Sequence, residues 1–214
     1  MKISGGLTEK GVVVGNCYDK YGSRNPIARR LIKGFESALT ELVDKVKPSN
    51  IHEVGCGEGY WTLRWLEQGI AVRGSDFSEK VIELARMNAL ERNLSPEVFK
   101  IRSIYDLDSA SDAAELVVCC EVLEHLERPQ DGLQRLQLVA NPYLIVSVPC
   151  EPIWSIMNIV RGKYLRNLGN TPGHIQRWSR SKFIQLVSRY FDIEEVRKPV
   201  PWTMLLCRCR SRLA

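Results

Sequence analysis

A short stretch of the chain, residues 119–129, concentrates groups that can take up a proton or hold a cation. Its sequence, CCEVLEHLERP, brings Glu121, Glu124 and His125 together directly after an apolar run. Carboxylates and imidazoles are costly to bury without a partner, so we expect this cluster at a site rather than inside a core. Oxygen and imidazole donors suit Mn²⁺ or Zn²⁺ better than Mg²⁺, and a neutral imidazole can act as a base near pH 7.

A second stretch has the spacing of a ligand-binding turn. EVGCGEG follows an apolar run and places a glycine at three alternate positions, Gly55, Gly57 and Gly59. Without β-carbons, the backbone can approach a ligand closely. Asp76 follows about 20 residues later, the spacing at which a carboxylate reaches the hydroxyls of a ribose. A dinucleotide-binding turn needs a small residue where this chain has Tyr60, so the pattern disfavours a nicotinamide or flavin cofactor.

The elements that must position these groups alternate along the chain. We expect strands at 51–55, 70–76, 97–103, 115–120 and 143–149. We expect helices at 25–46, 60–69, 78–93 and 122–140, the third capped by Ser78 and the last broken near Pro129. Strands that alternate with helices predict a parallel sheet covered on both faces.

The end of the chain has a different pattern. A helix at 179–191, capped by Ser179, precedes two strands at 192–200 and 202–210 that only Pro201 separates. That spacing predicts an antiparallel hairpin at the sheet edge. The predicted fold is therefore α/β and doubly wound, with a mostly parallel seven-stranded sheet and an antiparallel C-terminal hairpin.

The glycine turn and its acidic partners resemble those of class I S-adenosylmethionine-dependent methyltransferases of the small-molecule type. The resemblance covers roughly residues 50–149 and rests on Gly-x-Gly-x-Gly, with Glu53 two residues before it and Asp76 after the next strand. It implies a Rossmann-like methyltransferase fold and S-adenosylmethionine as cofactor. We then expect one domain over 1–214, divided into an N-terminal helical cap (1–47), a cofactor-binding core (48–149), an insertion or lid (150–178) and a C-terminal helix with β-hairpin (179–214).

The resemblance also assigns residues to the cofactor. Glu53 helps to position the methionine amino group, and Asp76 holds the ribose. The family usually has an acidic residue for the adenine after the third strand, and the aligned position here is Ser103. The full set of expected cofactor-binding residues is Glu53, Gly55, Cys56, Gly57, Gly59, Asp76, Phe77, Ser103 and Glu121.

Three interpretations of the polar cluster remain open. In the first, Glu121 contacts the cofactor while Glu124 and His125 cap and charge a helix start. In the second, His125 or the later His174 is a general base that takes a proton from an acceptor hydroxyl, so that the catalytic candidates are His174, Glu121 and His125. In the third, the less favoured one, a divalent metal is held by Glu121, Glu124, His125 and His174, as in small-RNA 2′-O-methyltransferases and partly in ubiquinone-pathway O-methyltransferases, which this constellation resembles. His52, inside a predicted strand, is expected to be structural.

The charge pattern bears on the acceptor. The net charge is +5, yet residues 152–191 contain no acidic side chain, and Arg161, Lys163 and Arg166 lie there beside an apolar stripe. An anionic or lipid-linked small molecule is therefore the expected acceptor, with peripheral membrane contact as an alternative and nucleic acid less favoured. The stripe is formed by Ile153, Ile156, Met157, Val160, Tyr164 and Leu168, and it suits core packing, a lid or an interfacial helix.

Two segments are expected to recognise the acceptor. Residues 16–30 include the candidate closing residues Tyr18 and Tyr21, and residues 154–178 form the insertion. Oxygen is the expected methylated atom. The alternatives are a metal-assisted RNA 2′-O-methyltransferase and a cofactor-binding protein without catalysis.

Composition indicates the compartment. The seven cysteines include no CxxC pair, and they lie mostly in apolar runs, which indicates reduced thiols. The amino-terminal sequence lacks the apolar core of a signal peptide, and no apolar stretch reaches the roughly 20 residues of a membrane span. We therefore expect a cytoplasmic protein.

Overall fold

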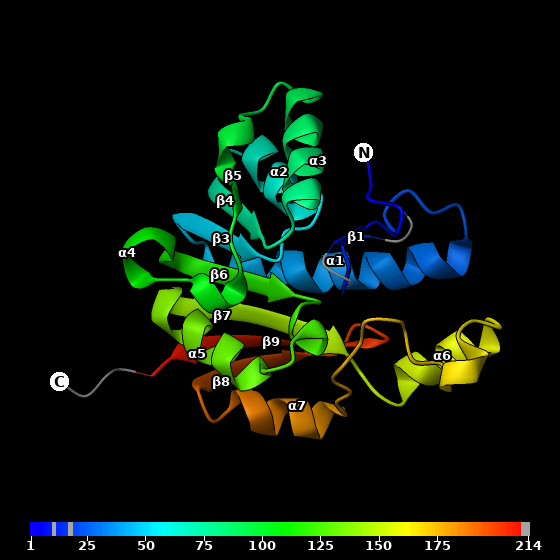
Figure 1. Ribbon diagram of the computed structural model, residues 1–214. Helices are drawn as coiled ribbons and strands as arrows, with labels where there is room; N and C mark the ends of the chain where they lie inside the picture. Colours follow the sequence, from blue (N-terminus) through cyan, green and yellow to red (C-terminus); the bar gives the residue numbers. More distant parts are fainter. Residues whose placement is uncertain (10–11, 17–18, 211–214) are drawn as a thin grey trace.

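A seven-stranded mixed sheet forms the centre of the protein, shown in Figure 1 as a computed structural model that describes residues 1–9, 12–16 and 19–210. The strand order is β5-β4-β3-β6-β7-β9-β8. The strands are β3 (Asn50–Val54), β4 (Ala71–Asp76), β5 (Phe99–Ile101), β6 (Ala114–Cys120), β7 (Ala140–Pro149), β8 (Phe191–Arg197) and β9 (Trp202–Cys209). Strands β3 to β7 pair in parallel, and β9 is antiparallel to both β7 and β8. The predicted fold class is confirmed, with β8 as the edge strand of the hairpin.

Helices cover both faces of this sheet. Helices α1 (Pro26–Val46) and α2 (Tyr60–Glu67) share one apolar cluster with the sheet, and α5 (Pro129–Val139) and α7 (Arg180–Val187) share another. Helix α3 (Glu79–Leu90) packs with α2 and β5 in a third cluster. The short α4 (Ser109–Asp112) precedes β6. Burial on both faces explains why β6 is apolar at every position except Glu115.

Local sequence signals set the helix ends. Asn25 caps α1, since its side-chain oxygen accepts from the amides of Ile27 at 2.9 Å and Ala28 at 3.2 Å. Ser78 caps α3 as predicted. The predicted helix over 122–140 is divided into a 3₁₀ turn, η3 (Leu123–His125), and α5, which begins at Pro129. Proline suits that first helical position because it has no amide hydrogen to leave unpaired.

The insertion after β7 differs from its expected form. Helix α6 (Ile153–Val160) is followed by the 3₁₀ turn η4 (Leu165–Asn167), so the apolar stripe does not lie on one helix. Helix α6 buries Ser155 and Asn158, whereas Ile156 and Val160 are exposed. The interpretation that the whole stripe packs in the core is therefore wrong. Within the described residues, no helix combines the length and the apolar character needed to cross a bilayer.

A two-stranded ladder lies near the amino terminus, in a segment for which the sequence pattern predicted no helix or strand. Strands β1 (Thr8–Glu9) and β2 (Val12–Val13) pair in antiparallel fashion. The side chain of Glu9 accepts from the hydroxyl of Ser78 at 2.5 Å. This segment is therefore attached to the start of α3, next to the predicted cofactor turn.

Candidate active site

The glycine turn joins β3 to α2 at the carboxyl end of the sheet. Gly55 has φ +76°, and a β-carbon built there lies only 2.2 Å from a methyl of Val122. Gly57 has φ +54°, but a β-carbon there meets only the Asn16 amide nitrogen at 3.9 Å. Gly55 is thus fixed by packing against the stretch after β6, whereas the space over Gly57 is open to a ligand.

Asp76 ends β4 beside this turn, as its spacing predicts. One carboxylate oxygen accepts from the Gly57 amide at 3.1 Å, and the other accepts from the Ser78 amide at 3.0 Å. Burial raises the pKa of Asp76, and the two amides oppose that change. The structure therefore brings Asp76 and the glycine turn together, which is the arrangement expected for a ribose site.

Glu53 lies at the end of β3, behind the turn. Its Oε2 accepts from the amide of Thr62 at 2.8 Å and from the hydroxyl of Thr62 at 2.5 Å. Burial raises the pKa of Glu53 from 4.5 to about 8, while the bonds to Thr62 and the charge of Lys20 oppose the shift. These contacts hold Glu53 in place at the start of α2, and an ammonium group beside it would stabilise its ionised form.

The remaining predicted cofactor residues differ in their surroundings. Cys56 is buried in the turn, and Phe77 is 47% exposed after β4. The Ser103 hydroxyl accepts from the Tyr105 amide at 3.2 Å and so caps the 3₁₀ turn η2 (Ile104–Asp106). Ser103 therefore has a structural task of its own, and its predicted contact with the adenine remains a prediction.

Glu58, a residue that the sequence reasoning missed, connects the turn to the amino-terminal segment. Its Oε1 accepts from the amides of Ser4 at 2.9 Å and Asn16 at 2.7 Å, and its Oε2 accepts from the Asn16 side chain. Its side chain is 1% exposed. The available signal was an acidic residue inside the turn, which has no reason to be buried unless amide donors surround it.

Glu121 follows β6 with φ +61°. Its Oε1 accepts from the Ser147 hydroxyl at 3.1 Å, and its Oε2 accepts from the Trp202 indole at 2.6 Å. Burial raises the pKa of Glu121, and the charge of Lys20 opposes this. Both oxygens of Glu121 thus already accept hydrogen bonds. Glu121 does not belong to the group of possible metal ligands, which consists of Glu124, His125 and His174.

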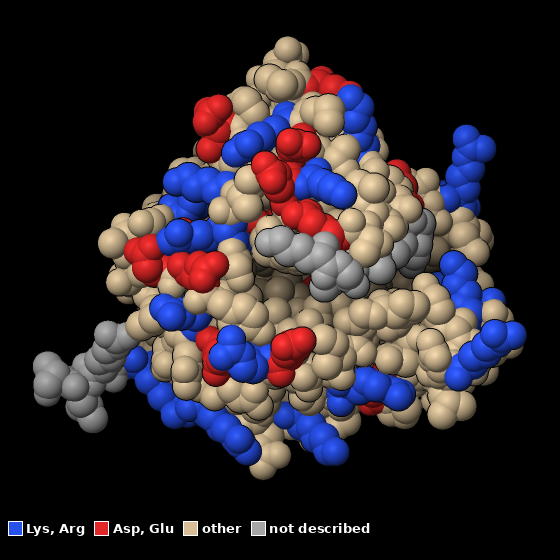
Figure 2. All heavy atoms as spheres, viewed as in Figure 1, with Lys and Arg blue, Asp and Glu red and all other residues tan. Residues whose placement is uncertain are grey.

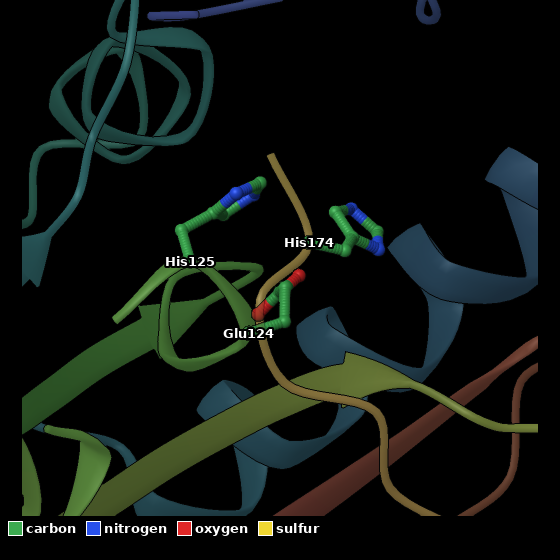
Figure 3. Close-up of side chains that lie close together, drawn as sticks. All are labelled: Glu124, His125 and His174. Atoms are coloured by element: carbon green, nitrogen blue, oxygen red, sulfur yellow. The ribbon is translucent and has the colours of Figure 1, made fainter. Parts of the chain in front are cut away.

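Glu124, His125 and His174 lie together at the carboxyl end of β6 (Figure 3). One ligand atom from each lies within 4.8 Å of the others. The Glu124 carbonyl accepts from the amides of Ile175 and Gln176, both at 2.9 Å. These backbone hydrogen bonds join two segments that are almost 50 residues apart in the sequence. They place the His174 ring next to Glu124 and His125, as Figure 3 shows.

The imidazole rings of His125 and His174 favour the neutral form, and their neighbours fix the direction in which each ring points. His125 Nδ1 donates to the Gly173 carbonyl at 2.9 Å, which leaves Nε2 with its lone pair. His174 lies edge-to-face on His125, with ring centroids 4.9 Å apart, and stacks on Trp154 at 5.8 Å. Burial and the adjacent His125 lower the pKa of His174 to about 4, and burial lowers the pKa of His125. Both rings can therefore accept a proton or a metal at neutral pH.

Glu124 is the unusual member of the group. It is 1% exposed, and neither carboxylate oxygen has a hydrogen-bond partner among the described residues. Burial and the Glu121 carboxylate raise the pKa of Glu124. An unpartnered buried carboxylate beside two neutral imidazoles fits a divalent cation, because the cation would satisfy the carboxylate and use both ring nitrogens.

The segment before α1 reaches the same area. Tyr21 stacks on Tyr60 with ring centroids 3.5 Å apart, and its hydroxyl accepts from the Trp61 indole at 3.1 Å. Tyr18, the other candidate closing residue, lies outside the described residues. The Lys20 ammonium lies 5.3 Å from the centroid of the Tyr21 ring, and its charge partly opposes the rise that burial causes in the pKa of Glu53, Glu121 and Glu124. Sequence reasoning did not single out Lys20.

Other predicted residues lie outside this centre. His52 is buried, and its Nδ1 donates to the Asp112 carbonyl while its Nε2 accepts from the Ser75 hydroxyl, both at 2.8 Å. These bonds agree with the structural role expected for it. Arg161 donates to the Asn158 side chain within the insertion, and Arg166 is exposed. Figure 2 shows the surface hollowed near the centre of this view, where β6 ends in Figure 1.

Comparison with known proteins agrees with this geometry. Residues 51–142 match a family described as Methyltransferase domain. The chain is 25% identical over 121 residues to the ubiquinone biosynthesis O-methyltransferase of Aeromonas salmonicida, covering 55% of the chain and 51% of that protein, and thus spans about half its length. It is 22% identical over 178 residues to the corresponding Coxiella burnetii protein, covering 76% of the chain and 71% of that protein.

A solved structure extends the likeness to the fold. Magnesium protoporphyrin IX methyltransferase from Synechocystis, with bound SAH, has a TM-score of 0.66 at 18% identity, covering 89% of this chain and 91% of that one. The matched domain, the sheet order and the glycine turn agree, so residues 51–142 form a methyltransferase domain and the chain has the fold of the class I S-adenosylmethionine-dependent methyltransferases. S-adenosylmethionine is the methyl donor of this class.

Proposed function

We propose that the protein transfers a methyl group from S-adenosylmethionine to a hydroxyl oxygen of a small molecule. The observation that carries this proposal is the cluster of Glu124, His125 and His174 beside the glycine turn. The Val122 side chain, between Glu121 and the cluster, packs on Gly55, so the acceptor groups and the cofactor turn share one wall. The relatives that act in ubiquinone biosynthesis are O-methyltransferases, which agrees with this choice.

The chemistry needs alignment and one proton acceptor. The sulfonium makes the methyl carbon electrophilic, so a new O–C bond forms as the C–S bond breaks, and the demethylated cofactor leaves. The acceptor hydroxyl must lose its proton in this step. The ring of His174 is the candidate to take it, because it lies in the cluster and its neutral form has a nitrogen lone pair at neutral pH. Trp154 and the bonds of Glu124 to the 175–176 backbone position that ring.

A second mode of action is favoured by the unpartnered oxygens of Glu124. In this mode Glu124, His125 and His174 hold a divalent cation, which supplies Lewis acidity toward the acceptor oxygens. The hydrogen bond from His125 Nδ1 to the Gly173 carbonyl would orient Nε2 for it. Glu121 is not required, since its two oxygens are bonded to Ser147 and Trp202.

The experiment that tests the function uses labelled methyl donor with hydroxyl-bearing acceptors, and calorimetry with the demethylated cofactor. His174→Ala should lower turnover by about 10²–10⁴-fold and leave affinity for the demethylated cofactor unchanged. Ile175→Ala, an exposed neighbour on the same segment, is the matched control. Repeating turnover after chelation, with Mn²⁺ added back, separates a base from a cation site. Cofactor binding without transfer to any acceptor would support a binding protein instead.

The exposed apolar side chains of the insertion support a lipid-linked acceptor. Ile156 is 54% exposed, Val160 81%, Leu165 56% and Leu168 73%, with Arg161 and Arg166 between them. Such a surface favours contact with an anionic bilayer. Co-sedimentation with phosphatidylglycerol vesicles tests this, because Ile156→Gln with Val160→Gln should weaken binding, whereas Leu90→Gln on α3 should not. Equal binding by all three proteins would remove the membrane from the proposal.

A further inference from the structure

A groove of about 480 Å³ lies between residues 20–21 and the first turns of α1. Its lining includes four basic side chains, one acidic side chain and one aromatic ring: Lys20, Arg29, Arg30, Lys33, Glu36 and Tyr21. Figure 2 shows blue Lys and Arg atoms spaced along the right side of the molecule, where Figure 1 places the start of α1 and, below it, the insertion with α6. The groove is thus a concave surface with a large excess of positive charge.

The acidic residue of the groove does not neutralise this charge. Glu36 Oε1 accepts from the Tyr60 hydroxyl at 2.6 Å and from the Arg64 guanidinium at 3.2 Å. In the part of the chain that the structure describes, none of the four basic side chains of the groove forms an ion pair. Their charges therefore remain available to a ligand.

Helix electrostatics make this arrangement unfavourable without an anion. Arg29, Arg30 and Lys33 lie in the first two turns of α1, at the positive end of the helix dipole, and the first turn contains no acidic residue. They also repel one another across three and four positions. The other end of α1 is balanced, because Glu41 pairs with Arg197 and Lys45 pairs with Glu195. The imbalance is confined to the groove.

The groove adjoins the active site. Tyr21, on its wall, stacks on Tyr60, the first residue of α2 after the glycine turn. Packed rings also connect α1 to His174: His174 stacks on Trp154, the Trp154 and Trp202 centroids are 5.8 Å apart, and Trp202 lies 5.1 Å from Phe35 of α1. A molecule whose hydroxyl reaches His174 therefore lies on the side of the sheet that α1 covers.

We propose that this groove binds a phosphate-bearing group of the acceptor. Arginine guanidinium forks match phosphate oxygens in pairs, and a group with two or more negative charges would balance several of the four cations at once. The inference rests on the proposed function, which supplies the reacting hydroxyl. It narrows the acceptor to a phosphorylated molecule, whether the phosphate belongs to a soluble ester or to a lipid head group.

Calorimetry with inorganic pyrophosphate, at low salt and without divalent cations, tests the groove directly. The intact chain should bind it saturably, and Arg29→Gln with Lys33→Gln should weaken binding at least tenfold. Lys182→Gln with Arg189→Gln, exposed on and just after α7, is the matched control and should bind as the wild type does. Affinity should also fall as salt rises, because ionic contacts are screened. All variants should keep their affinity for the demethylated cofactor.

Vesicles distinguish the two sources of the phosphate. Pyrophosphate binding assigns the group to a soluble acceptor, whereas capture only on phosphatidylglycerol vesicles, lost in the Arg29/Lys33 variant, assigns it to a head group. The inference is overturned if neither probe binds, or if the groove variant and the α7 variant behave alike. Failure of the demethylated cofactor to bind counts against the proposed function instead, and pyrophosphate still tests the groove.

Discussion

The two halves of the active site are built in different ways. The cofactor half consists of one turn and the end of the next strand, with Glu53, Glu58 and Asp76 each accepting at least two hydrogen bonds. The acceptor half joins η3 to a distant segment and leaves both oxygens of Glu124 unpartnered within the described chain. The carboxylates of the first half are satisfied by protein donors, whereas the second half has a buried carboxylate without a hydrogen-bond partner among the described residues.

The largest effect on stability is expected from adding a β-carbon at Gly55, where the glycine turn contacts the stretch after β6. Gly55→Ala places that carbon 2.2 Å from a Val122 methyl at φ +76°, so backbone strain and overpacking should lower the free energy of unfolding by about 2–5 kcal/mol. Cofactor affinity should fall with it. Chemical denaturation and calorimetry measure both. Gly34→Ala in α1, with open space and ordinary φ, should instead raise stability by about 0.5–1 kcal/mol. Similar results for the two variants would contradict the packing argument.

Next in size is the response of Glu124. Glu124→Gln should lower Mn²⁺ affinity by about 10-fold or more, since it removes the ligand charge, and leave affinity for the demethylated cofactor unchanged. Glu124→Leu should abolish Mn²⁺ binding yet raise the metal-free stability by about 1–3 kcal/mol, because it removes an unsatisfied buried carboxylate. Manganese titration and denaturation provide the two measurements. A destabilised Glu124→Leu protein would mean that the carboxylate has a partner in solution.

The next effect is a slope of stability against pH, and it concerns Glu53. Burial raises its pKa from 4.5 to about 8, so between these values the folded state keeps a proton that the unfolded chain has released. The free energy of unfolding therefore falls as pH rises through this window, by up to about 1.4 kcal/mol per pH unit. Glu53→Gln should flatten that slope in denaturation experiments, with Glu121 and Glu124 leaving a remainder. An unchanged slope would show that Glu53 is ionised in the folded protein.

The smallest effect is expected at Ser103. Its hydroxyl caps η2 through the Tyr105 amide, so Ser103→Ala should cost about 0.5–1 kcal/mol of stability. Affinity for the demethylated cofactor should change less than threefold if the residue only caps. Calorimetry with Ser103→Ala decides between the cap and the adenine contact that alignment predicts. A large loss of affinity would extend the cofactor half to this residue.

The sequence predicted that the glycine turn and Asp76 lie together, because the information for this arrangement is local. Glycine spacing, the strand before it and Asp76 after the next strand define one turn, and parallel strands bring their carboxyl ends to one edge. The acceptor half depends on contacts between distant segments. The sequence near His174 does not predict that the amides of residues 175–176 donate to the Glu124 carbonyl. It also does not predict that the Trp202 indole donates to Glu121.

The insertion was the least predictable element. Its apolar period suggested one amphipathic surface, but Gly162 and Gly169 adopt positive φ, and the chain turns after Val160. The buried face of α6 carries Ser155 and Asn158, which bond to Glu151 and to the Gly169 carbonyl. Hydrogen bonds rather than apolar contacts therefore determine which face of α6 is buried. Hydrophobic periodicity in the sequence predicts only apolar burial, so it could not reveal this face.

The attachment of the amino-terminal segment to Glu58 makes two backbone amides into natural probes. The amide hydrogens of Ser4 and Asn16 both point at the Glu58 carboxylate, which belongs to the predicted cofactor turn. Stiffening of the turn by a ligand should slow the exchange of these two hydrogens with deuterated solvent, although neither residue belongs to the sheet. Isotope uptake at these two amides would then report ligand binding at the glycine turn.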